Sequence, residues 1–344
     1  MPSKTKTSPL VWVLQTSRVG DNAQAWALAK ALGWETEVRS LRFNPLFAVP
    51  NVMLGSTLVT LDHEASDRLV APWPDLVIGV GRRTVPVSRW IKANSNGKTK
   101  LVQLGRPRAD NTHFDLVISS PQYRLSVENN VLHNLLPLPR HEADLPELET
   151  KYWLEIFKRF PQPWTGVFLG GAKWPFKMDP ETIAAFANNV AKHDGSFLIT
   201  TSPRTPPETA SIIRKCMGER AFVHVWDGGM LNPYQAILNL ANRFIVTGDS
   251  ASMLSEACAT GCEVEIFDLP SRQSAGVVIE TGNVLAMTGL INPPRDMKSL
   301  HSQLFAAGHA APLGQNGEIR AQTKAPNDLE KALQRVRELM KAAA

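Results

Sequence analysis

Short, unbroken apolar runs separated by turn residues and helical segments recur along the first half of the chain. Four of them predict strands at 10–14, 76–79, 101–104 and 116–118. Residues 22–32 predict a helix that ends at Gly33, because glycine readily adopts the backbone conformation that closes a helix. The runs do not alternate apolar with polar residues, which is typical of strands buried on both faces. This pattern predicts a parallel sheet covered by helices.

The same alternation restarts in the second half of the chain. Its predicted strands are 167–169, 197–200, 222–225, 244–246 and 264–267. Its predicted helices are 180–191, a segment after Pro206, 234–241 and 252–259. Five strands with four intervening helices predict a second doubly wound unit. Residues 271–322 are less periodic, and 327–341 predict a terminal amphipathic helix.

The length of 344 residues exceeds what one hydrophobic core usually serves, so two domains are expected. The composition changes between residues 137 and 163, where prolines gather around an acidic stretch at 142–149. We therefore expect an N-terminal Rossmann-like domain at 1–145, a linker at 146–163 and a C-terminal Rossmann-like domain at 164–325. The remaining helix, 326–344, is of a kind that often packs across the junction of a two-lobed enzyme.

Composition narrows the class of protein only mildly. The net charge is +5, yet the charged fraction of 20% is ordinary and the lysines and arginines are spread along the chain. Such a charge favours anionic ligands or anionic lipid surfaces, and the absence of a concentrated basic stripe argues against nucleic acid. Three cysteines without metal-ligand spacing indicate a reduced, cytoplasmic setting. No apolar run approaches 18 residues, so we expect no membrane span.

Several common catalytic signatures fail on particular residues. The pair of glycines at 79 and 81 begins a dinucleotide fingerprint, but the third glycine is missing. The chain has no G-x-S-x-G for a serine hydrolase. It also has no Asp-x-Asp, the motif that holds a divalent metal ion in one large class of glycosyltransferases.

Three predicted strand ends in the second half carry the residues expected where a doubly wound sheet binds its ligands. After the first, Gly170 and Gly171 let backbone amides approach a phosphate and Lys173 adds a charge, although a tight turn with an exposed lysine explains them equally well. After the second, Ser202 and Arg204 precede a helix started by Pro206, and a capping turn leaves the arginine without a role.

The third strand end is the stretch from Thr247 to Glu256. Ser250 and Ser252 lie near the start of a helix, where an anion is stabilised by the backbone donors. Glu256 follows one turn later, where a carboxylate can accept hydrogen bonds from a ribose diol. A capping box is the alternative for Glu256, but the residue three positions earlier is Met253, which cannot form one.

Six motifs together resemble the bacterial relatives of the plant mitochondrial fission protein family (elongated mitochondria), a group similar to glycosyltransferase-B enzymes. The motifs are Gly20-Asp21-Asn22-Ala23-Gln24, Gly81-Arg82-Arg83, Gln103 to Arg108, Thr201 to Pro206, Asn232-Pro233-Tyr234 and Thr247 to Ala257. The resemblance covers residues 12 to 267. The chain departs from the family pattern at Pro203, where relatives often carry a second arginine, and that change weakens the case for one diphosphate contact.

The resemblance implies an α/β protein with two Rossmann-like doubly wound domains facing a cleft, and a nucleoside-diphosphate sugar bound to the C-terminal one. The residues expected to bind the nucleotide sugar are Gly171, Lys173, Ser202, Arg204, Trp226, Gly228, Asn232, Asp249, Ser250, Ser252 and Glu256. Among them, Glu256 is expected on the ribose, and the base is expected near Trp226 to Gly228. The residues expected on the acceptor side are Gly20, Arg82, Arg83, Arg106 and Arg108. Asp21 is the candidate catalytic base, with His113 and His133 as alternatives.

The function expected from these features is metal-independent transfer of a sugar from a nucleoside-diphosphate donor, without a further cofactor, to an anionic lipid or glycan acceptor of the cell envelope. Peripheral contact with the inner membrane would accompany such an acceptor. A non-catalytic scaffold that binds nucleotide, or associates with a membrane, is the alternative, because a fold alone does not specify activity.

Overall fold

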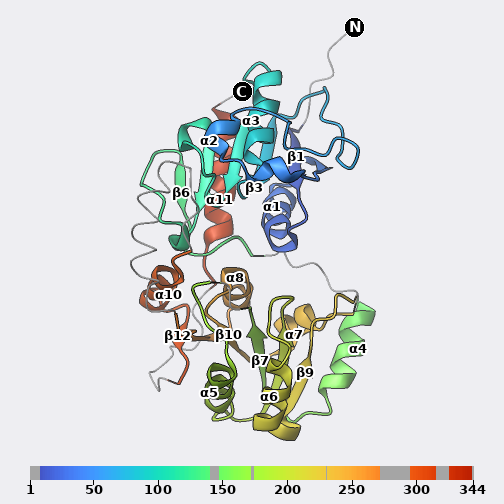
Figure 1. Ribbon diagram of the computed structural model, residues 1–344, viewed down its shortest axis with the longest axis vertical. Helices are drawn as coiled ribbons and strands as arrows, with labels where there is room; N and C mark the ends of the chain where they lie inside the picture. The colour runs from blue at the N-terminus through green and yellow to red at the C-terminus, as the bar shows by residue number, and fades with distance from the viewer. Residues whose placement is uncertain are drawn as a thin grey trace. The chain divides into compact units, whose positions relative to one another are not determined.

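The computed structural model describes residues 8–139, 147–171, 174–229, 231–271, 295–314 and 325–342. The chain divides into two compact units, each with its own six-stranded sheet (Figure 1). The first unit contains the six N-terminal strands together with the C-terminal helix of the chain, and the second contains the other six strands.

All neighbouring strands of the first sheet run parallel, in the order β2-β1-β3-β4-β5-β6. The strands are β1 (Leu10–Gln15), β2 (Glu35–Ser40), β3 (Leu76–Val80), β4 (Lys100–Leu104), β5 (Leu116–Ser119) and β6 (Val131–His133). The chain moves from β1 outward to β2 and then returns to the other side of β1 with β3. The strand order therefore reverses between β1 and β3, the position at which doubly wound sheets leave a crevice for ligands.

Both faces of this sheet are buried. Alternate residues of β1 point to opposite faces, so Val11 and Val13 pack with α1 (Val19–Leu32) and α11 (Asp328–Lys341), whereas Trp12 packs with α3 (Val85–Asn94). Shorter helical turns are η1 (Pro45–Ala48), α2 (Asn51–Leu54), η2 (Asn111–His113) and η3 (Pro121–Tyr123). Helix α11 thus completes the hydrophobic core of the first unit, although it is the last helix in the sequence.

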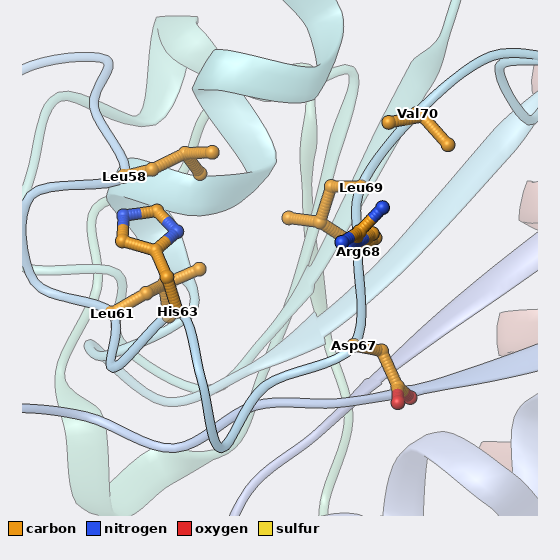
Figure 2. Close-up of a pocket in the computed structure, with 7 residues that line it drawn as sticks. All are labelled: Leu58, Leu61, His63, Asp67, Arg68, Leu69 and Val70. Atoms are coloured by element: carbon orange, nitrogen blue, oxygen red, sulfur yellow. The ribbon is translucent and has the colours of Figure 1, made fainter.

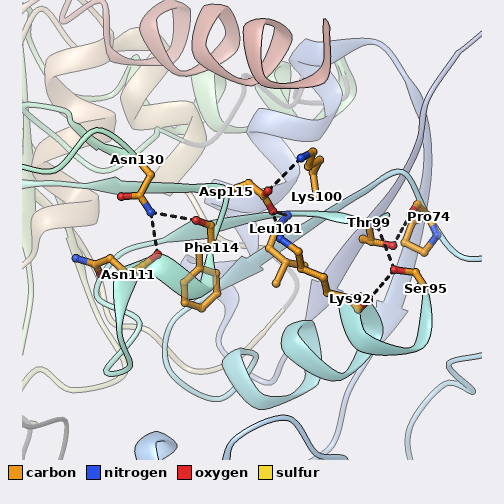
Figure 3. A network of polar contacts seen from close by, with 10 residues as sticks. All are labelled: Pro74, Lys92, Ser95, Thr99, Lys100, Leu101, Asn111, Phe114, Asp115 and Asn130. Carbon is orange, nitrogen blue, oxygen red and sulfur yellow. Dashed lines mark hydrogen bonds and ion pairs between the residues drawn. The ribbon is translucent and has the colours of Figure 1, made fainter. Parts of the chain in front are cut away.

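A polar network joins α3, β4 and β5 at the edge of the sheet where β4 begins (Figure 3). The Asp115 carboxylate accepts hydrogen bonds from Lys92 Nζ at 2.6 Å and from the Leu101 amide at 2.8 Å, and Lys100 Nζ lies 3.3 Å from it. Burial alone would raise the pKa of Asp115, but these hydrogen bonds and the two lysine charges outweigh it and hold the pKa below its ordinary value. Asp115 therefore fixes the amino ends of the strands.

The second sheet is also parallel throughout, in the order β12-β11-β10-β7-β8-β9. Its strands are β7 (Trp164–Leu169), β8 (Ser196–Thr201), β9 (Ala221–His224), β10 (Arg243–Thr247), β11 (Glu263–Phe267) and β12 (Ala311–Pro312). Here the strand order reverses between β7 and β10, which are adjacent. The crevice of the second unit is therefore expected beyond the carboxyl ends of these two strands.

Helices cover both faces of the second sheet as well. They are α4 (Glu147–Phe157), α5 (Pro180–Val190), α6 (Thr209–Met217), α7 (Tyr234–Leu240), α8 (Ala251–Ala259) and α10 (Met297–Ala306), with a short turn η4 (Gly218–Arg220). Val167 and Leu169 of β7 pack with α5 and α6. Phe168 between them points to the other face, where its ring centroid lies 4.5 Å from that of Tyr234 in α7.

The predicted fold class is confirmed, because both units are α/β with parallel, doubly wound sheets. The segment that we predicted as a linker, 146–163, contains helix α4, whose Trp153 and Phe157 pack on Phe222 of β9. The final helix begins at the predicted position, and its contacts with α1 and β5 belong to the first unit.

One ion pair of the second unit predicts how its stability depends on pH. His193 Nε2 lies 2.8 Å from Glu265 Oε1, and the hydrogen bond between them raises the pKa of His193 although burial opposes the charge. The stabilisation is complete below the ordinary histidine pKa and is lost as pH rises through the raised value in the folded protein. We expect His193→Gln to lower the free energy of unfolding by about 1–2 kcal/mol below about pH 6, and by less at alkaline pH.

Chemical denaturation of both proteins across this pH range measures the difference. His224→Gln is the matched control, because burial lowers the pKa of His224 and its neutral form is favoured in the fold. A loss for His193→Gln that stays constant with pH would contradict a contribution from the charged imidazole.

Candidate functional site

Four loops follow the carboxyl ends of the adjacent strands β9, β8, β7 and β10 and carry the residues predicted to bind a nucleotide. Because the strands are parallel and adjacent, the sheet itself brings these loops to one edge. Gly170 and Gly171 follow β7, Arg204 follows β8, Trp226 follows β9, and Asp249 follows β10. Lys173, also predicted for this site, lies outside the described residues.

The two glycines after β7 are held directly against the loop after β10. The Gly170 amide donates to Thr247 Oγ1 at 2.8 Å, and the Gly171 amide donates to Asp249 Oδ2 at 2.9 Å. A Cβ atom at position 170 would lie 2.4 Å from Asp249 Oδ1. Glycine is therefore needed here for the close approach of two loops.

Gly171 is equally close to the loop after β8. A Cβ atom on it would lie 2.1 Å from the Cβ of Arg204 and 2.4 Å from its carbonyl carbon. Thr205 reinforces the contact, since its hydroxyl donates to the Gly170 carbonyl at 2.6 Å. The Arg204 backbone is thus fixed, while its side chain belongs to an exposed residue and is available to an anion.

Asp249 is the central acceptor of these loops. Its Oδ2 accepts from the Gly171 amide, and its Oδ1 accepts from the Thr247 hydroxyl at 2.8 Å. Burial raises the pKa of the carboxyl, and the hydrogen bonds together with the charge of Arg204 oppose that rise. Because both oxygens are engaged within the protein, we assign Asp249 to holding the loops in place for a ligand.

Helix α8 begins directly after Asp249, with Ser250 as its N-cap residue. Ser250 has no side-chain capping bond to the helix, so its hydroxyl is not used to satisfy the first helical amides. Ser252 follows in the first turn, and both serines are partly exposed. The site therefore presents two hydroxyls beside a helix terminus whose partial positive charge stabilises anions.

Glu256, one turn into α8, is oriented by an aromatic residue of α7. The hydroxyl of Tyr234 donates to Glu256 Oε2, and the Tyr234 ring packs on Phe168 of β7. Asn232 fixes the start of this helix, because its Oδ1 accepts from the Tyr234 amide at 2.9 Å. Asn232 therefore acts on Glu256 through Tyr234, a residue to which the sequence assigned no role.

Trp226 lies beyond β9 and is 42% exposed. Its amide donates to Thr201 Oγ1 of β8 at 2.8 Å, which ties its loop to the neighbouring strand. Gly228 follows with a φ of 78°, in the left-handed region that favours glycine. An exposed indole on a fixed backbone can stack on a planar base.

A buried histidine hydrogen-bonds to the backbone of the loop after β10. His301 of α10 is 2% exposed, and its two ring nitrogens lie 2.7 Å from Asp268 Oδ1 and 2.8 Å from the Gly248 carbonyl. The hydrogen bond from His301 lowers the pKa of Asp268, against the effect of burial. His301 falls in the stretch that the sequence left without a prediction, and it fixes the residue just before Asp249.

In the first unit, the predicted catalytic residue Asp21 lies in the first turn of α1, directly after Gly20. Its Oδ2 is 3.6 Å from Arg18 Nη1, and it would lie 3.5 Å from a Cβ atom at Gly81 in the loop after β3. Asp21 is therefore placed at the reversal of strand order between β1 and β3. The alternatives are placed elsewhere, because His113 precedes β5 at the amino ends of the strands and His133 ends the edge strand β6.

The four arginines predicted for the acceptor side come from the loops after β3 and β4, which are adjacent strands. Burial lowers the pKa of Arg82, and the charges of Arg108, Arg83 and Arg18 lower it further. Burial and the charge of Arg106 likewise lower the pKa of Arg108. These guanidinium groups are thus near enough to repel one another.

Asn51 joins the two arginine loops. Its side-chain amide donates to the Arg82 carbonyl at 2.9 Å and to the Pro107 carbonyl at 2.8 Å, and the residue is 2% exposed. The like charges are therefore held together by a buried, neutral side chain that no sequence motif identified.

The first unit also holds a cavity of about 330 Å³, drawn in Figure 2. Leu58, Leu61 and His63 line one side, and Arg68 and Leu69 line the other. None of the predicted site residues lines this cavity.

Within the described ranges, no group of three or more His, Cys, Asp or Glu side chains is arranged to hold a metal ion. No helix in the described part of the chain has the length and apolar character needed to cross a membrane.

Two parallel, doubly wound sheets in separate compact units, with loops suited to anions at their strand ends, define an α/β protein of the two-domain Rossmann-like class. The chain belongs to the mitochondrial fission ELM1 family, whose model matches residues 19–326. The predicted resemblance is therefore confirmed.

Two relatives illustrate the family. The mitochondrial fission protein ELM1 of Arabidopsis thaliana is 28% identical over an alignment of 218 residues that covers 56% of this chain and 51% of the plant protein. The chain thus spans about half the length of that relative. The uncharacterized protein RP120 of Rickettsia prowazekii is 26% identical over 300 residues, covering 77% of this chain and 84% of that protein.

Solved structures similar to the chain include glycosyltransferase-B-like proteins. UGT89C1 of Arabidopsis thaliana, complexed with UDP-L-rhamnose, has 12% identity and a TM-score of 0.48, covering 99% of this chain and 100% of that one. MurG of Acinetobacter baumannii has 13% identity and a TM-score of 0.45, covering 96% and 100% respectively. Similarity at this level does not indicate what this chain binds.

The contact between Gly171 and Arg204 predicts the effect of a single methyl group. Gly171→Ala places a Cβ against the Arg204 backbone, which cannot move away without disturbing the loop after β8. We expect a loss of about 1–3 kcal/mol of unfolding free energy from overpacking. We also expect the affinity for nucleoside diphosphates, measured by titration calorimetry, to fall about 10-fold or more. Displacement of the loop after β8 would cost the charge-assisted hydrogen bond expected between Arg204 and the diphosphate.

Gly261→Ala is the matched control. Gly261 has a positive φ, of 74°, and nothing lies within 4 Å of its added Cβ. That variant should lose stability from backbone strain and bind nucleotide normally. Equal affinities of the two variants would contradict a role for Gly171 in the site.

Proposed function

We propose that the protein is a metal-independent glycosyltransferase that takes a nucleoside-diphosphate sugar on its second unit and transfers the sugar to an anionic acceptor of the cell envelope. The observation that carries this proposal is the group of four loops at the carboxyl edge of the second sheet. They combine a backbone that excludes side chains at Gly170 and Gly171 with an exposed arginine and an uncapped helix N-terminus.

The diphosphate binds where these donors converge. The first amides of α8 and the hydroxyls of Ser250 and Ser252 receive its oxygens, and Arg204 adds a guanidinium charge. Ser202 contributes by fixing the Arg204 backbone, since its Oγ accepts from the Arg204 amide at 3.3 Å. The same donors stabilise the negative charge that develops on the leaving nucleoside diphosphate, a role that a metal ion serves in other transferases.

The nucleoside is recognised on either side of the diphosphate. The Glu256 carboxylate accepts hydrogen bonds from the ribose diol, in an orientation set by Tyr234. Trp226 and Gly228 form the surface on which the base lies. These assignments place the nucleoside across the ends of β9, β8, β7 and β10.

In the transfer step, the bond between the anomeric carbon and the diphosphate oxygen breaks, and the nucleoside diphosphate leaves with the electron pair. An acceptor hydroxyl oxygen bonds to the anomeric carbon, and its proton moves to the Asp21 carboxylate. Arg82, Arg83, Arg106 and Arg108 hold the anionic part of the acceptor. A lipid and a glycan of the envelope both offer such a hydroxyl beside an anionic group.

The role of Glu256 predicts a selective loss of affinity. Glu256→Ala should weaken nucleoside diphosphates by about 10-fold to 100-fold, because two hydrogen bonds to a carboxylate are lost. It should leave free pyrophosphate unaffected, since pyrophosphate has no ribose. Titration calorimetry with both ligands measures the two affinities.

Two variants sharpen this test. Tyr234→Phe keeps the ring on Phe168 but removes the hydroxyl that orients Glu256, so an intermediate loss is expected. Glu219→Ala removes an exposed carboxylate of η4, at the amino edge of the same sheet, and should change neither affinity. Equal losses of both ligands on Glu256→Ala would refute the ribose contact.

The role of Asp21 predicts a loss of rate without a loss of donor affinity. Asp21→Asn should slow sugar transfer by about 100-fold or more, the usual effect of removing a general base. Donor binding should be unchanged because Asp21 belongs to the first unit. Release of nucleoside diphosphate from each nucleotide sugar that binds is the measured rate.

Glu35→Gln, an exposed carboxylate of β2 in the same unit, is the matched control and should retain full activity. A wild-type rate in Asp21→Asn would refute its role as the general base. Nucleotide binding with no transfer from any donor would instead support the non-catalytic scaffold.

A further inference from the structure

The arginine loops of the first unit carry more positive charge than the described residues of the chain neutralise. Among the described residues, neither Arg82, Arg83, Arg106 nor Arg108 forms an ion pair, and the nearby Asp21 pairs with Arg18. Arg82 and Arg106 donate to backbone carbonyls, of Val49 and Tyr123. The Nε of Arg108 is buried and has no hydrogen-bond partner in the described part of the chain. A buried donor of this kind favours a ligand that supplies an acceptor.

The segment 45–54 is fastened to these loops. Asn51 donates to the Arg82 and Pro107 carbonyls, and the Arg83 guanidinium lies 3.9 Å from the centre of the Phe47 ring. The segment comprises η1 and α2, and residues 44–61 contain no charged side chain. The uncharged segment 45–54 is therefore held directly beside the cationic arginine loops.

The segment 45–54 exposes alkyl side chains. Leu46 and Val52 are each 47% exposed, and Met53 is 71% exposed. A segment that leaves such side chains in water while its backbone is tied to a fixed framework is suited to an apolar environment supplied by a partner. The adjoining cations restrict the class of partner to one that combines apolar and anionic groups.

A membrane surface with phosphate-bearing lipids has this combination in the matching arrangement. Arginine binds phosphate through several donors in fixed directions, and clustered cations near a bilayer are attracted by anionic headgroups. Alkyl side chains beside them enter the boundary between headgroups and acyl chains. A soluble phosphate compound would satisfy the arginines but would leave the apolar side chains of the segment 45–54 in water.

We propose that the arginine loops and the segment 45–54 form one docking surface for an anionic phospholipid, with the arginines on its phosphate and Leu46, Val52 and Met53 in the edge of the hydrocarbon layer. This rests on the proposed function only where it makes the acceptor a lipid-linked phosphate compound. The docking itself requires no transfer reaction.

The test is co-sedimentation of the full chain with phosphatidylcholine vesicles that contain or lack phosphatidic acid. Wild-type protein should bind the anionic vesicles and not the neutral ones, and added salt should weaken the binding. The double variant Arg82→Gln with Arg108→Gln should bind about 30-fold more weakly, given the usual contribution of each arginine near an anionic surface. Val52→Ser with Met53→Ser should also lose most of its binding, because the apolar contact is removed.

Matched controls change the same residue types elsewhere in the first unit. Arg335→Gln with Arg337→Gln removes two exposed charges of α11, and Val127→Ser removes a valine that is 91% exposed. Both should bind vesicles as the wild type does. Thermal unfolding of each variant verifies that it is folded.

Three results would overturn the proposal. Equal binding to neutral and anionic vesicles would show that the net negative charge of the headgroup is not recognised, and wild-type binding by the arginine variant would show that these arginines are not the site. Loss in the arginine variant with full binding by Val52→Ser with Met53→Ser would leave a phosphate site without lipid docking, and competition by glycerol 3-phosphate would then identify a soluble ligand.

Nucleoside diphosphate binding, measured in the same samples, separates this proposal from the proposed function. It uses the second unit, so vesicle binding that fails while nucleotide binding persists overturns the docking surface and leaves the donor site standing. The reverse result overturns the donor site alone.

Discussion

The contact of Gly171 with Asp249 and Arg204 is the constraint on which the site of the second unit depends. Its backbone amide donates to the Asp249 carboxylate in the loop after β10, and its α-carbon lies against the backbone of the loop after β8. Three loops can meet this closely only because the residue between them has no side chain. The sheet places the strand ends side by side, and this contact converts that neighbourhood into a fixed arrangement of donors.

Supporting residues extend the arrangement outward. His301 holds the Gly248 carbonyl from below, and Tyr234 holds the Glu256 carboxylate from the adjacent helix. The first unit follows the same principle with different residues, because Asn51 ties together the two loops that carry the arginines. In both units, the residues proposed to contact a ligand are oriented by side chains that hydrogen-bond to them or to their loops.

The sequence predicted those parts of the molecule that local patterns encode. Unbroken apolar runs identified the buried central strands, and glycine and hydroxyl residues after them predicted the loops of the candidate site. Strand β2 carries no such run, since its residues are Glu35–Ser40 and each is at least partly exposed, and it was not predicted. The hydrogen bonds of His301, Asn51 and Tyr234 join residues distant in sequence, and no local pattern records such pairs. The roles assigned to Glu256 and Asp21 remain predictions.

The bridge made by Asn51 has a consequence for how an anion is received. Guanidinium groups repel one another, so a site with flexible loops would separate them and would have to gather them again when a ligand arrived. Here the repulsion is already overcome during folding, by a buried amide that holds Arg82 and Pro107 in place. Preorganisation of this kind strengthens binding because the loops do not have to be ordered when the ligand binds. Part of the folding free energy of the first unit therefore offsets the repulsion between guanidinium groups and holds them in an arrangement suited to an anion.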